Sequence, residues 1–405
     1  MSFTPFQSLV LQNDTKIVLL VLDGVGDLPH PEHGHATPLE AARTPNLDAI
    51  APRAALGRLL PVAPGITPGS GPGHLALFGY DPVETQVGRG VLEALGAGIE
   101  LGPGDVAARA NFCTVDGSGV VTDRRAGRIP SETCARLVRL LTEKIPRVED
   151  IEFRLQAGKG HRFVAVLHGM GLDDGVSDAD PHKEGHPIPL AEPTGLRPGS
   201  KRTADMVNQF VAEARRVLAN EHPANAAMLR GISARPNLPG FHKRFGLQGA
   251  AIAAYPMYRG VAQLAGMSVH AVGETPEESF AKAAELWKVN DFFFIHAKAT
   301  DMAGEDGNFD AKVAAIETVD RALPRLLETK PDVLCITGDH STPVAIKGHS
   351  WHPVPVLVLA PYAGADQAPR FHEKTARTGS LSTLASRDLM AILLANAGRL
   401  DKFGA

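Results

Sequence analysis

The sequence predicts an α/β protein in which helices cover both faces of a parallel sheet, with a smaller α+β domain inserted into the first domain. Short, nearly continuous apolar runs recur along the chain, and strands buried on both faces of a parallel sheet have this composition. Helical patterns alternate with these runs, which is the order typical of α/β domains. The chain of 405 residues is also too long for one compact core, so we expect two domains.

The expected strands of the first domain end in polar residues or glycine. They are the apolar runs at residues 16–24, 249–256, 291–301, 331–341 and 354–361. Helical patterns occur between the later runs, at residues 275–289 and 310–330. Thr44 and Pro45 predict the start of an earlier helix, because threonine caps helices and proline is favoured at the first helical position.

The middle of the chain has a different pattern. Short strand-like pieces at residues 106–115 and 161–169 alternate with joins rich in proline and glycine. We interpret residues 103–240 as the inserted domain. The first domain then consists of residues 1–102 and 241–405.

The composition is that of a soluble globular protein, with 44% hydrophobic and 21% charged residues. The net charge of −4, with both signs interspersed, argues against a nucleic-acid surface. Three widely spaced cysteines indicate neither a disulfide framework nor a zinc knuckle. The start of the chain has no signal-peptide pattern, and the purest apolar run, 17–22, is too short to span a membrane. We therefore expect a cytoplasmic protein without a nucleic-acid or membrane partner; the oligomeric state is not indicated.

Polar residues follow several of the expected strands. In an open α/β sheet, ligands bind beyond the carboxyl ends of the strands. The residues found there, or in the loops that follow, are Asp23, Asp301, Glu305, Asp339, His340 and His349. Carboxylates mixed with imidazoles suit divalent metals such as Mn²⁺, Mg²⁺, Co²⁺ or Zn²⁺. An aspartate at a strand end can also be a simple turn former, and His352 is an alternative ligand to His349.

A glycine-rich segment at residues 64–82 contains a candidate nucleophile. Ser70 lies between Gly69 and Gly71, ahead of a helical pattern whose amino end offers amide donors to a phosphate. A serine there becomes an apt nucleophile if a metal lowers the pKa of its hydroxyl. The alternative is a flexible turn that caps a helix. The segment is neither a Walker A loop nor a nucleophile elbow.

Basic residues gather in the predicted inserted domain. They are Arg109, Arg124, Arg125, Arg128, His161, Arg162 and Arg230. Guanidinium groups bind carboxylate or phosphate through two hydrogen bonds, so the group predicts a small substrate with several negative charges. The alternative is that individual arginines are solvated and paired with nearby acids. Asp178, Asp180 and His182 accompany them in the segment SDADPHK.

Nine separated motifs occur in one order along nearly the whole chain. They are LVLDGVGD, ATPLEAARTPNLDAIA, TPGSGPGHLALFGYDP, GRGVLEALGAG, DRRAGRI, SDADPHKEGHP, AAYPMYRGVAQLAGM, KATDMAGEDGNF and GDHSTPVAIKGHSWHPVPVL. With these motifs the chain closely resembles the archaeal-type 2,3-bisphosphoglycerate-independent phosphoglycerate mutases of the alkaline phosphatase superfamily. The resemblance implies an alkaline-phosphatase-like, metal-binding first domain and a substrate-binding inserted domain.

The resemblance also implies an activity and a set of roles. The activity is the interconversion of 3-phosphoglycerate and 2-phosphoglycerate through a phosphoserine at Ser70. One metal would be held by Asp23, Ser70, Asp339 and His340, and the other by Asp301, Glu305 and His349. The basic residues of the inserted domain would hold the substrate. For the mechanism that follows, we take Asp178 or His182 as candidate proton carriers and Arg259 as a candidate for stabilising charge on the transferring phosphoryl group.

One position departs from the family pattern. Glu305 stands where the family usually has histidine, and a carboxylate is a harder ligand that adds negative charge. We therefore expect a preference for Mn²⁺ or Mg²⁺, with Zn²⁺ and Co²⁺ as alternatives. A metal-dependent phosphomonoesterase or another phosphomutase of the same superfamily is the main alternative function. A non-catalytic binding protein is a second one, but the intact Ser70 and ligand set argue against it.

Overall fold

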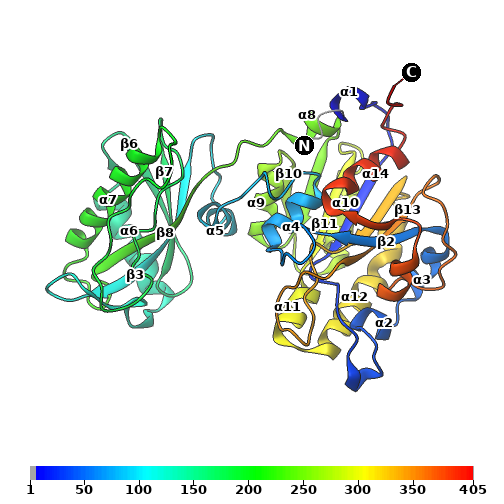
Figure 1. Ribbon diagram of the computed structural model, residues 1–405, viewed down its shortest axis with the longest axis horizontal. Helices are drawn as coiled ribbons and strands as arrows, with labels where there is room; N and C mark the ends of the chain where they lie inside the picture. Colours follow the sequence, from blue (N-terminus) through cyan, green and yellow to red (C-terminus); the bar gives the residue numbers. More distant parts are fainter. Residues whose placement is uncertain (1–5, 405) are drawn as a thin grey trace. The chain divides into compact units, whose positions relative to one another are not determined.

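The computed structural model describes residues 6–404, which form two compact units. The first unit contains the chain up to Gln86 and from Leu238 onwards, and the second is Val87–Asn237. Colours in Figure 1 follow the sequence, so the second unit runs from cyan into green. The second unit begins before residue 103 because helix α5 (Arg89–Gly96) packs on two of its strands, β3 and β8. Its sequence alone does not show this attachment.

The first unit is built on an eight-stranded sheet in the order β10-β9-β11-β1-β12-β13-β2-β14. The strand bounds are β1 Ile17–Leu22, β2 Ala55–Leu60, β9 Gly249–Ala253, β10 Ser268–Ala271, β11 Phe292–Ala297, β12 Val333–Thr337, β13 Val354–Leu359 and β14 Ser382–Ala385. The pairs on the β10 side, from β10 to β12, are parallel. The α/β class that the sequence predicts is therefore confirmed.

One strand of the expected parallel sheet, β13, runs in the opposite direction. This strand pairs antiparallel with both β12 and β2. A parallel return needs a crossover, usually a helix, whereas the loop 338–353 between β12 and β13 contains no α-helix. The apolar run of β13 is buried like the others, so its composition does not reveal its direction.

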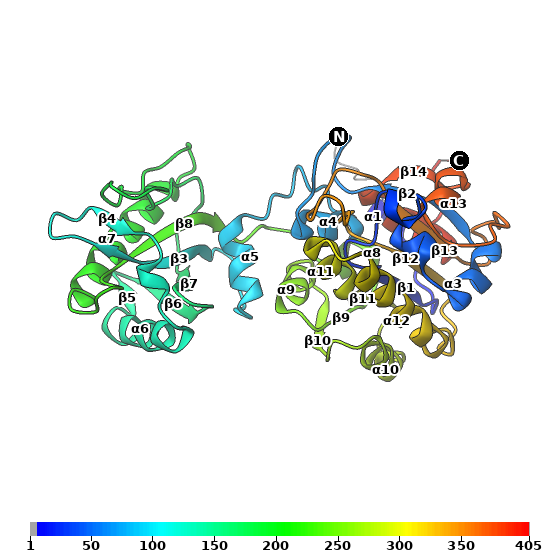
Figure 2. The same cartoon turned by 90° about the horizontal axis from the view of Figure 1, so that it is seen from below.

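Helices lie on both faces of this sheet. On one face, apolar residues of the strands pack with α2 (Pro38–Ala41), α3 (Pro45–Ile50), α10 (Pro276–Leu286) and α12 (Phe309–Leu327). The other face carries α4 (Ser70–Leu77), α9 (Pro256–Leu264) and α14 (Leu389–Asn396), and Phe78, directly after α4, packs edge-on against Phe294 of β11. Figures 1 and 2 show these two helical layers. The remaining helices of the unit are α1 (Phe6–Leu9), α8 (Phe241–Phe245), α11 (Ala299–Asp306) and α13 (Glu373–Thr378).

The start of α3 differs in detail from the prediction. Thr44 occupies the capping position and Pro45 follows it, but the Thr44 hydroxyl accepts no helix amide. The buried carboxylate of Asp320 in α12 does so instead, because the amide of Leu47 donates to it over 2.7 Å. A carboxylate distant in sequence therefore caps this helix.

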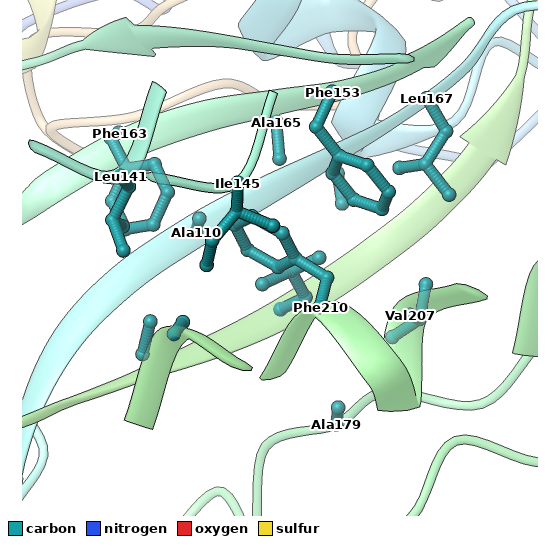
Figure 3. Packing of buried hydrophobic residues seen from close by; sticks show 14 of the residues in the cluster. Ala110, Leu141, Ile145, Phe153, Phe163, Ala165, Leu167, Ala179, Val207 and Phe210 are labelled. Atoms are coloured by element: carbon teal, nitrogen blue, oxygen red, sulfur yellow. The ribbon is translucent and has the colours of Figure 1, made fainter. Parts of the chain in front are cut away.

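The second unit is a six-stranded antiparallel sheet with helices, an α+β arrangement. Its order is β4-β3-β7-β6-β5, and β8 pairs with β3. The strands are β3 Val106–Val115, β4 Val121–Asp123, β5 Arg147–Val148, β6 Ile151–Ala157, β7 Arg162–His168 and β8 Ala226–Ala234. Helices α6 (Ser131–Lys144) and α7 (Ser200–Val217) share a core with this sheet. Figure 3 shows Phe153 of β6 beside Phe210 of α7, whose rings stack at 4.5 Å.

No helix within residues 6–404 is long and apolar enough to cross a membrane.

Candidate active site

The carboxyl ends of three neighbouring strands bring acidic residues together in the first unit. β11, β1 and β12 are adjacent and parallel, so their carboxyl ends meet at one edge of the sheet. Asp23 follows β1 directly, and Asp339 follows β12 after one glycine. Asp301 lies in the first turn of α11, just after β11. All three aspartates are fully buried.

Asp23, Asp339 and His340 form the first ligand cluster. One potential ligand atom from each residue lies within 4.8 Å of the others. His340 Nε2 is 3.1 Å from Asp339 Oδ2 and 3.4 Å from Asp23 Oδ1. Neither of these two oxygens accepts a hydrogen bond of good geometry from any described residue. Buried carboxylate oxygens without a donor are costly, so this cluster fits a bound cation.

Asp301, His340 and His349 form the second ligand cluster by the same criterion. His349 Nε2 is 3.7 Å from Asp301 Oδ1 and 3.8 Å from Glu305 Oε1. The Glu305 side chain is half-exposed and lies outside the three-residue group. His352 instead contacts the Ser350 hydroxyl, so the structure brings His349 to the cluster.

Hydrogen bonds determine which nitrogen each histidine presents. The Thr342 hydroxyl is 2.6 Å from Asp301 Oδ1 and 3.0 Å from His340 Nδ1. Because it donates its single proton to the carboxylate, it accepts from His340 Nδ1–H and leaves Nε2 free. His349 Nδ1 is 3.0 Å from the carbonyl oxygen of Pro68, which can only accept. Both histidines therefore turn Nε2 toward the clusters, as a metal-binding imidazole does.

The charges around the clusters favour the ligating forms. Burial would raise the pKa of Asp23, but a hydrogen bond from His296 and the charge of Lys298 help to hold that pKa well below its usual value. Burial lowers the pKa of His340, and the attraction of Asp339 and Asp23 does not reverse this. Asp23 is therefore ionised and His340 neutral at pH 7.

Ser70 lies beside the first cluster. It is the first residue of α4, and its Oγ is 3.3 Å from His340 Nε2. The helix approaches the strand end closely, because a Cβ added at Gly73 would lie 2.7 Å from the carbonyl oxygen of Asp339. Glycine at this position lets the serine reach the carboxylates. The hydroxyl thus combines a helix amino end with a candidate cation site.

Four buried or half-buried side chains support the clusters, and sequence reasoning did not find them. His74 Nδ1 is 2.8 Å from the Ser70 carbonyl oxygen and 3.2 Å from Asp339 Oδ2. His296 Nε2 is 2.9 Å from Asp23 Oδ2, and the Tyr258 ring stacks on His296 at 3.8 Å. Lys298 contacts Asp23 and Asp301. The sequence carries a signal for His296 and Lys298, because a histidine and a lysine at the end of an apolar strand need polar partners.

Lys312 connects the two loops that carry the first cluster. This lysine of α12 is fully buried, and its ammonium donates to the carbonyls of Gly24 and Thr342, each at 2.8 Å. It also donates to the Asp27 carboxylate at 2.7 Å. Gly24 follows Asp23, and Thr342 lies two residues after His340. Lys312 therefore holds the backbone of both ligand loops to one point.

Replacing Lys312 with methionine is expected to lower the free energy of unfolding by about 3–5 kcal/mol, because the buried Asp27 carboxylate loses its countercharge. Urea denaturation of the metal-free protein measures this change. K282M, which removes a partly exposed lysine of α10 paired with Glu285, serves as the control with an effect below about 0.5 kcal/mol. A K312M loss below about 1 kcal/mol would show that the network contributes little.

The basic residues of the second unit form two groups. Arg124 binds both oxygens of the buried Asp180 at 2.8 Å, as the alternative interpretation of a paired arginine expects. It also lines a cavity with Asp123, Arg125, Gly127, Arg128, His182, Lys183 and Glu184. His182 Nε2 is 3.1 Å from Asp178 Oδ2.

The second group surrounds Arg109, which is buried and contacts Glu93 at 3.2 Å. Burial lowers the pKa of Arg109 and that of His161, and neighbouring guanidinium groups add to both effects, among them Arg162. Arg230 also contributes at Arg109 and lies 3.8 Å from Asp180. These cationic groups lie close enough to affect one another's pKa values, and a bound anion would relieve their repulsion.

Arg259 belongs to the first unit. Its guanidinium donates to the backbone carbonyls of Ala253 and Ala254 at the carboxyl end of β9. These bonds place it on the same edge of the sheet as the clusters.

Comparison with known proteins gives consistent matches. A family model described as 2,3-bisphosphoglycerate-independent phosphoglycerate mutase matches residues 51–225. A protein of Thermotoga neapolitana, named a probable 2,3-bisphosphoglycerate-independent phosphoglycerate mutase, is 53% identical over 98% of each chain. A protein of the same name from Thermus thermophilus is 51% identical over 100% of this chain and 99% of its own.

Two solved structures share the fold along nearly the whole chain. The cofactor-independent phosphoglycerate mutase of Thermoplasma acidophilum superposes with a TM-score of 0.77 at 33% identity, covering 95% of this chain and 100% of its own. A protein of Pyrococcus horikoshii superposes with a TM-score of 0.79 at 32% identity, covering 96% and 99%.

Proposed function

The chain belongs to the family of 2,3-bisphosphoglycerate-independent phosphoglycerate mutases, and we propose on this basis that it interconverts 3-phosphoglycerate and 2-phosphoglycerate through a phosphoserine at Ser70. The single observation that carries the proposal is the position of the Ser70 hydroxyl. It lies at the amino end of α4, 3.3 Å from His340 and beside buried carboxylates that lack donors.

The two clusters fit two divalent cations. Asp23, Ser70, Asp339 and His340 would hold one cation, and Asp301, Glu305 and His349 would hold the other. When bound, such cations would lower the pKa of the serine hydroxyl and neutralise negative charge on the phosphoryl group. The four negative charges of Asp23, Asp301, Glu305 and Asp339 would balance the four positive charges of two divalent cations. The carboxylate of Glu305 favours Mn²⁺ or Mg²⁺ over Zn²⁺ or Co²⁺, and a metal titration with best activity in Zn²⁺ would contradict this preference.

Ser70 carries the phosphoryl group between two oxygens of the substrate. Its Oγ attacks the 3-phosphate, the bond from phosphorus to the substrate oxygen breaks, and glycerate remains bound. The 2-hydroxyl of glycerate then attacks the phosphoserine and frees Ser70. The amide groups at the amino end of α4 are suited to hold the phosphoryl oxygens, and Arg259 is a further candidate for that contact.

The second unit supplies recognition of the glycerate part of the substrate. Its proposed contacts are Arg109, Arg124, Arg125, Arg128, His161, Arg162 and Arg230. Because Asp180 holds Arg124, that guanidinium is fixed in direction and pre-organised for an anion. Asp178 and His182, which contact each other, are the candidate proton carriers for the 2-hydroxyl.

Coupling the reaction to enolase tests the function and its metal dependence together. We expect purified protein with Mn²⁺ to produce 2-phosphoglycerate from 3-phosphoglycerate, and EDTA to reduce the rate by at least about a thousandfold, reversibly on adding Mn²⁺. Inorganic phosphate is measured in the same samples. Release of phosphate without 2-phosphoglycerate would identify a phosphomonoesterase instead, and turnover that survives complete metal removal would contradict the cation sites.

A further inference from the structure

Lys298 is placed between the two ligand clusters. Its ammonium lies 3.1 Å from Asp23 Oδ2 and 2.5 Å from Asp301 Oδ2, so it contacts one carboxylate from each cluster. Among the described residues, it is the one lysine or arginine that forms ion pairs with Asp23, Asp301 or Asp339. Its side chain is 17% exposed.

In each of these two carboxylates, the two oxygens have different partners. Asp23 turns Oδ2 to Lys298 and His296, whereas Oδ1 faces His340 and has no donor. Asp301 turns Oδ2 to Lys298, whereas Oδ1 faces His349 and the Thr342 hydroxyl. Lys298 therefore contacts Oδ2 of both aspartates and leaves their Oδ1 atoms facing His340 and His349.

The charge of this centre is unbalanced without Lys298. Three fully buried aspartates lie here, and Lys298 contacts two of them. Isolated buried charges are strongly unfavourable, so a permanent cation stabilises the centre when no metal is bound. The same ammonium repels an arriving divalent cation, because like charges at this range interact strongly inside a protein.

We propose that Lys298 is a resident countercation that bridges the two clusters, stabilises the metal-free centre and weakens the binding of divalent cations. This inference rests on the proposed function, since it assumes that the clusters bind cations. It assigns to Lys298 a positioning role through Asp23 and Asp301. Lys298 thus balances the charge of the buried carboxylates when no metal is bound, and its repulsion keeps bound metals exchangeable.

The test compares K298M with K298R and K16M. Lys16 is a matched control, because its side chain is 18% exposed and pairs with one carboxylate, Asp291, at the other end of β1. Thermal unfolding is measured after EDTA treatment, and Mn²⁺ binding is measured by titration calorimetry. For K298M we expect the melting temperature of the metal-free protein to fall by at least about 4 °C and Mn²⁺ to bind about tenfold more tightly. K298R should match the wild type in both measurements, and K16M should leave Mn²⁺ affinity unchanged.

Both effects of K298M are required. An unchanged melting temperature without metal, or Mn²⁺ affinity that is equal or weaker, would overturn the inference, as would K298R behaving like K298M. If K298M folds only with Mn²⁺ present, it is purified in Mn²⁺. Unfolding when EDTA is added would then be a large loss of stability of the metal-free protein, as expected. If the wild type binds no Mn²⁺, the cation sites of the proposed function are refuted. If the wild type binds Mn²⁺ and K298M has the same melting temperature and Mn²⁺ affinity as the wild type, only the role of Lys298 is refuted.

Discussion

Replacing Ser70 with alanine is expected to reduce the conversion of 3-phosphoglycerate to 2-phosphoglycerate by at least about a thousandfold, because it removes the hydroxyl that is proposed to accept the phosphoryl group. Ser70 is only partly buried and begins α4, where alanine is tolerated, so thermal unfolding should shift by less than about 3 °C. Activity is measured with enolase, and phosphorylation of the protein by mass spectrometry after a rapid acid quench. The phosphorylated species should be present in the wild type and absent in S70A.

Ser131 offers a matched control for this substitution. It is also the first residue of a helix, α6, and its hydroxyl accepts the amide of Gly160. S131A should retain nearly all activity and the phosphorylated species. If S70A instead keeps wild-type turnover, the serine has no covalent role, and a direct transfer between substrate oxygens would have to replace the proposed mechanism.

The fold class could be predicted from the sequence because strands buried on both faces of a sheet are composed almost entirely of apolar residues. Runs such as IVLLVL in β1 contain no polar residue to face solvent. Strand direction does not affect this composition, since β13 is as apolar as β1 although it runs the opposite way. Direction depends on whether a connection contains a crossover helix, and the loop before β13 has turns where a helix would be needed.

The acidic members of the site were accessible to sequence reasoning for a topological reason. Residues that follow parallel strands meet at one edge whatever the details of packing, so Asp23, Asp301 and Asp339 could be grouped before any distance was known. The structure brings these three together with His340 and His349.

The supporting residues could not be grouped in this way. His74 meets Asp339 across 265 positions of sequence, and their contact depends on how closely α4 approaches the strand end. Lys312 lies in the first turn of α12, and a lysine of a helix ordinarily faces solvent. Its burial follows from four oxygen acceptors that other segments supply. Pairing of this kind is a property of the folded chain and not of local spacing.

Two buried aspartates of the first unit should respond to the same substitution in opposite ways. Asp339 and Asp320 are both fully buried. D339N is expected to reduce activity by at least about a thousandfold and to lower the number of bound Mn²⁺ ions, because the asparagine oxygen carries no charge for a cation. The metal-free D339N protein should lose less stability than D320N, because burial and repulsion from Asp23 oppose the attraction of His340 and His74 that lowers the pKa of Asp339.

D320N should show the reverse pattern. Asp320 accepts from the amides of Leu47 and Asn46 at the start of α3, and an amide in its place loses charge and turns a donor toward one of them. Its free energy of unfolding should fall by about 1–3 kcal/mol, while turnover per folded molecule and Mn²⁺ binding stay unchanged. Urea denaturation in EDTA, calorimetry with Mn²⁺ and the enolase assay measure all three quantities on both variants. Since the two aspartates share burial but not partners, a similar loss of stability in both would mean that Asp339 serves the fold, and the assignment of the first cluster to a cation would be wrong.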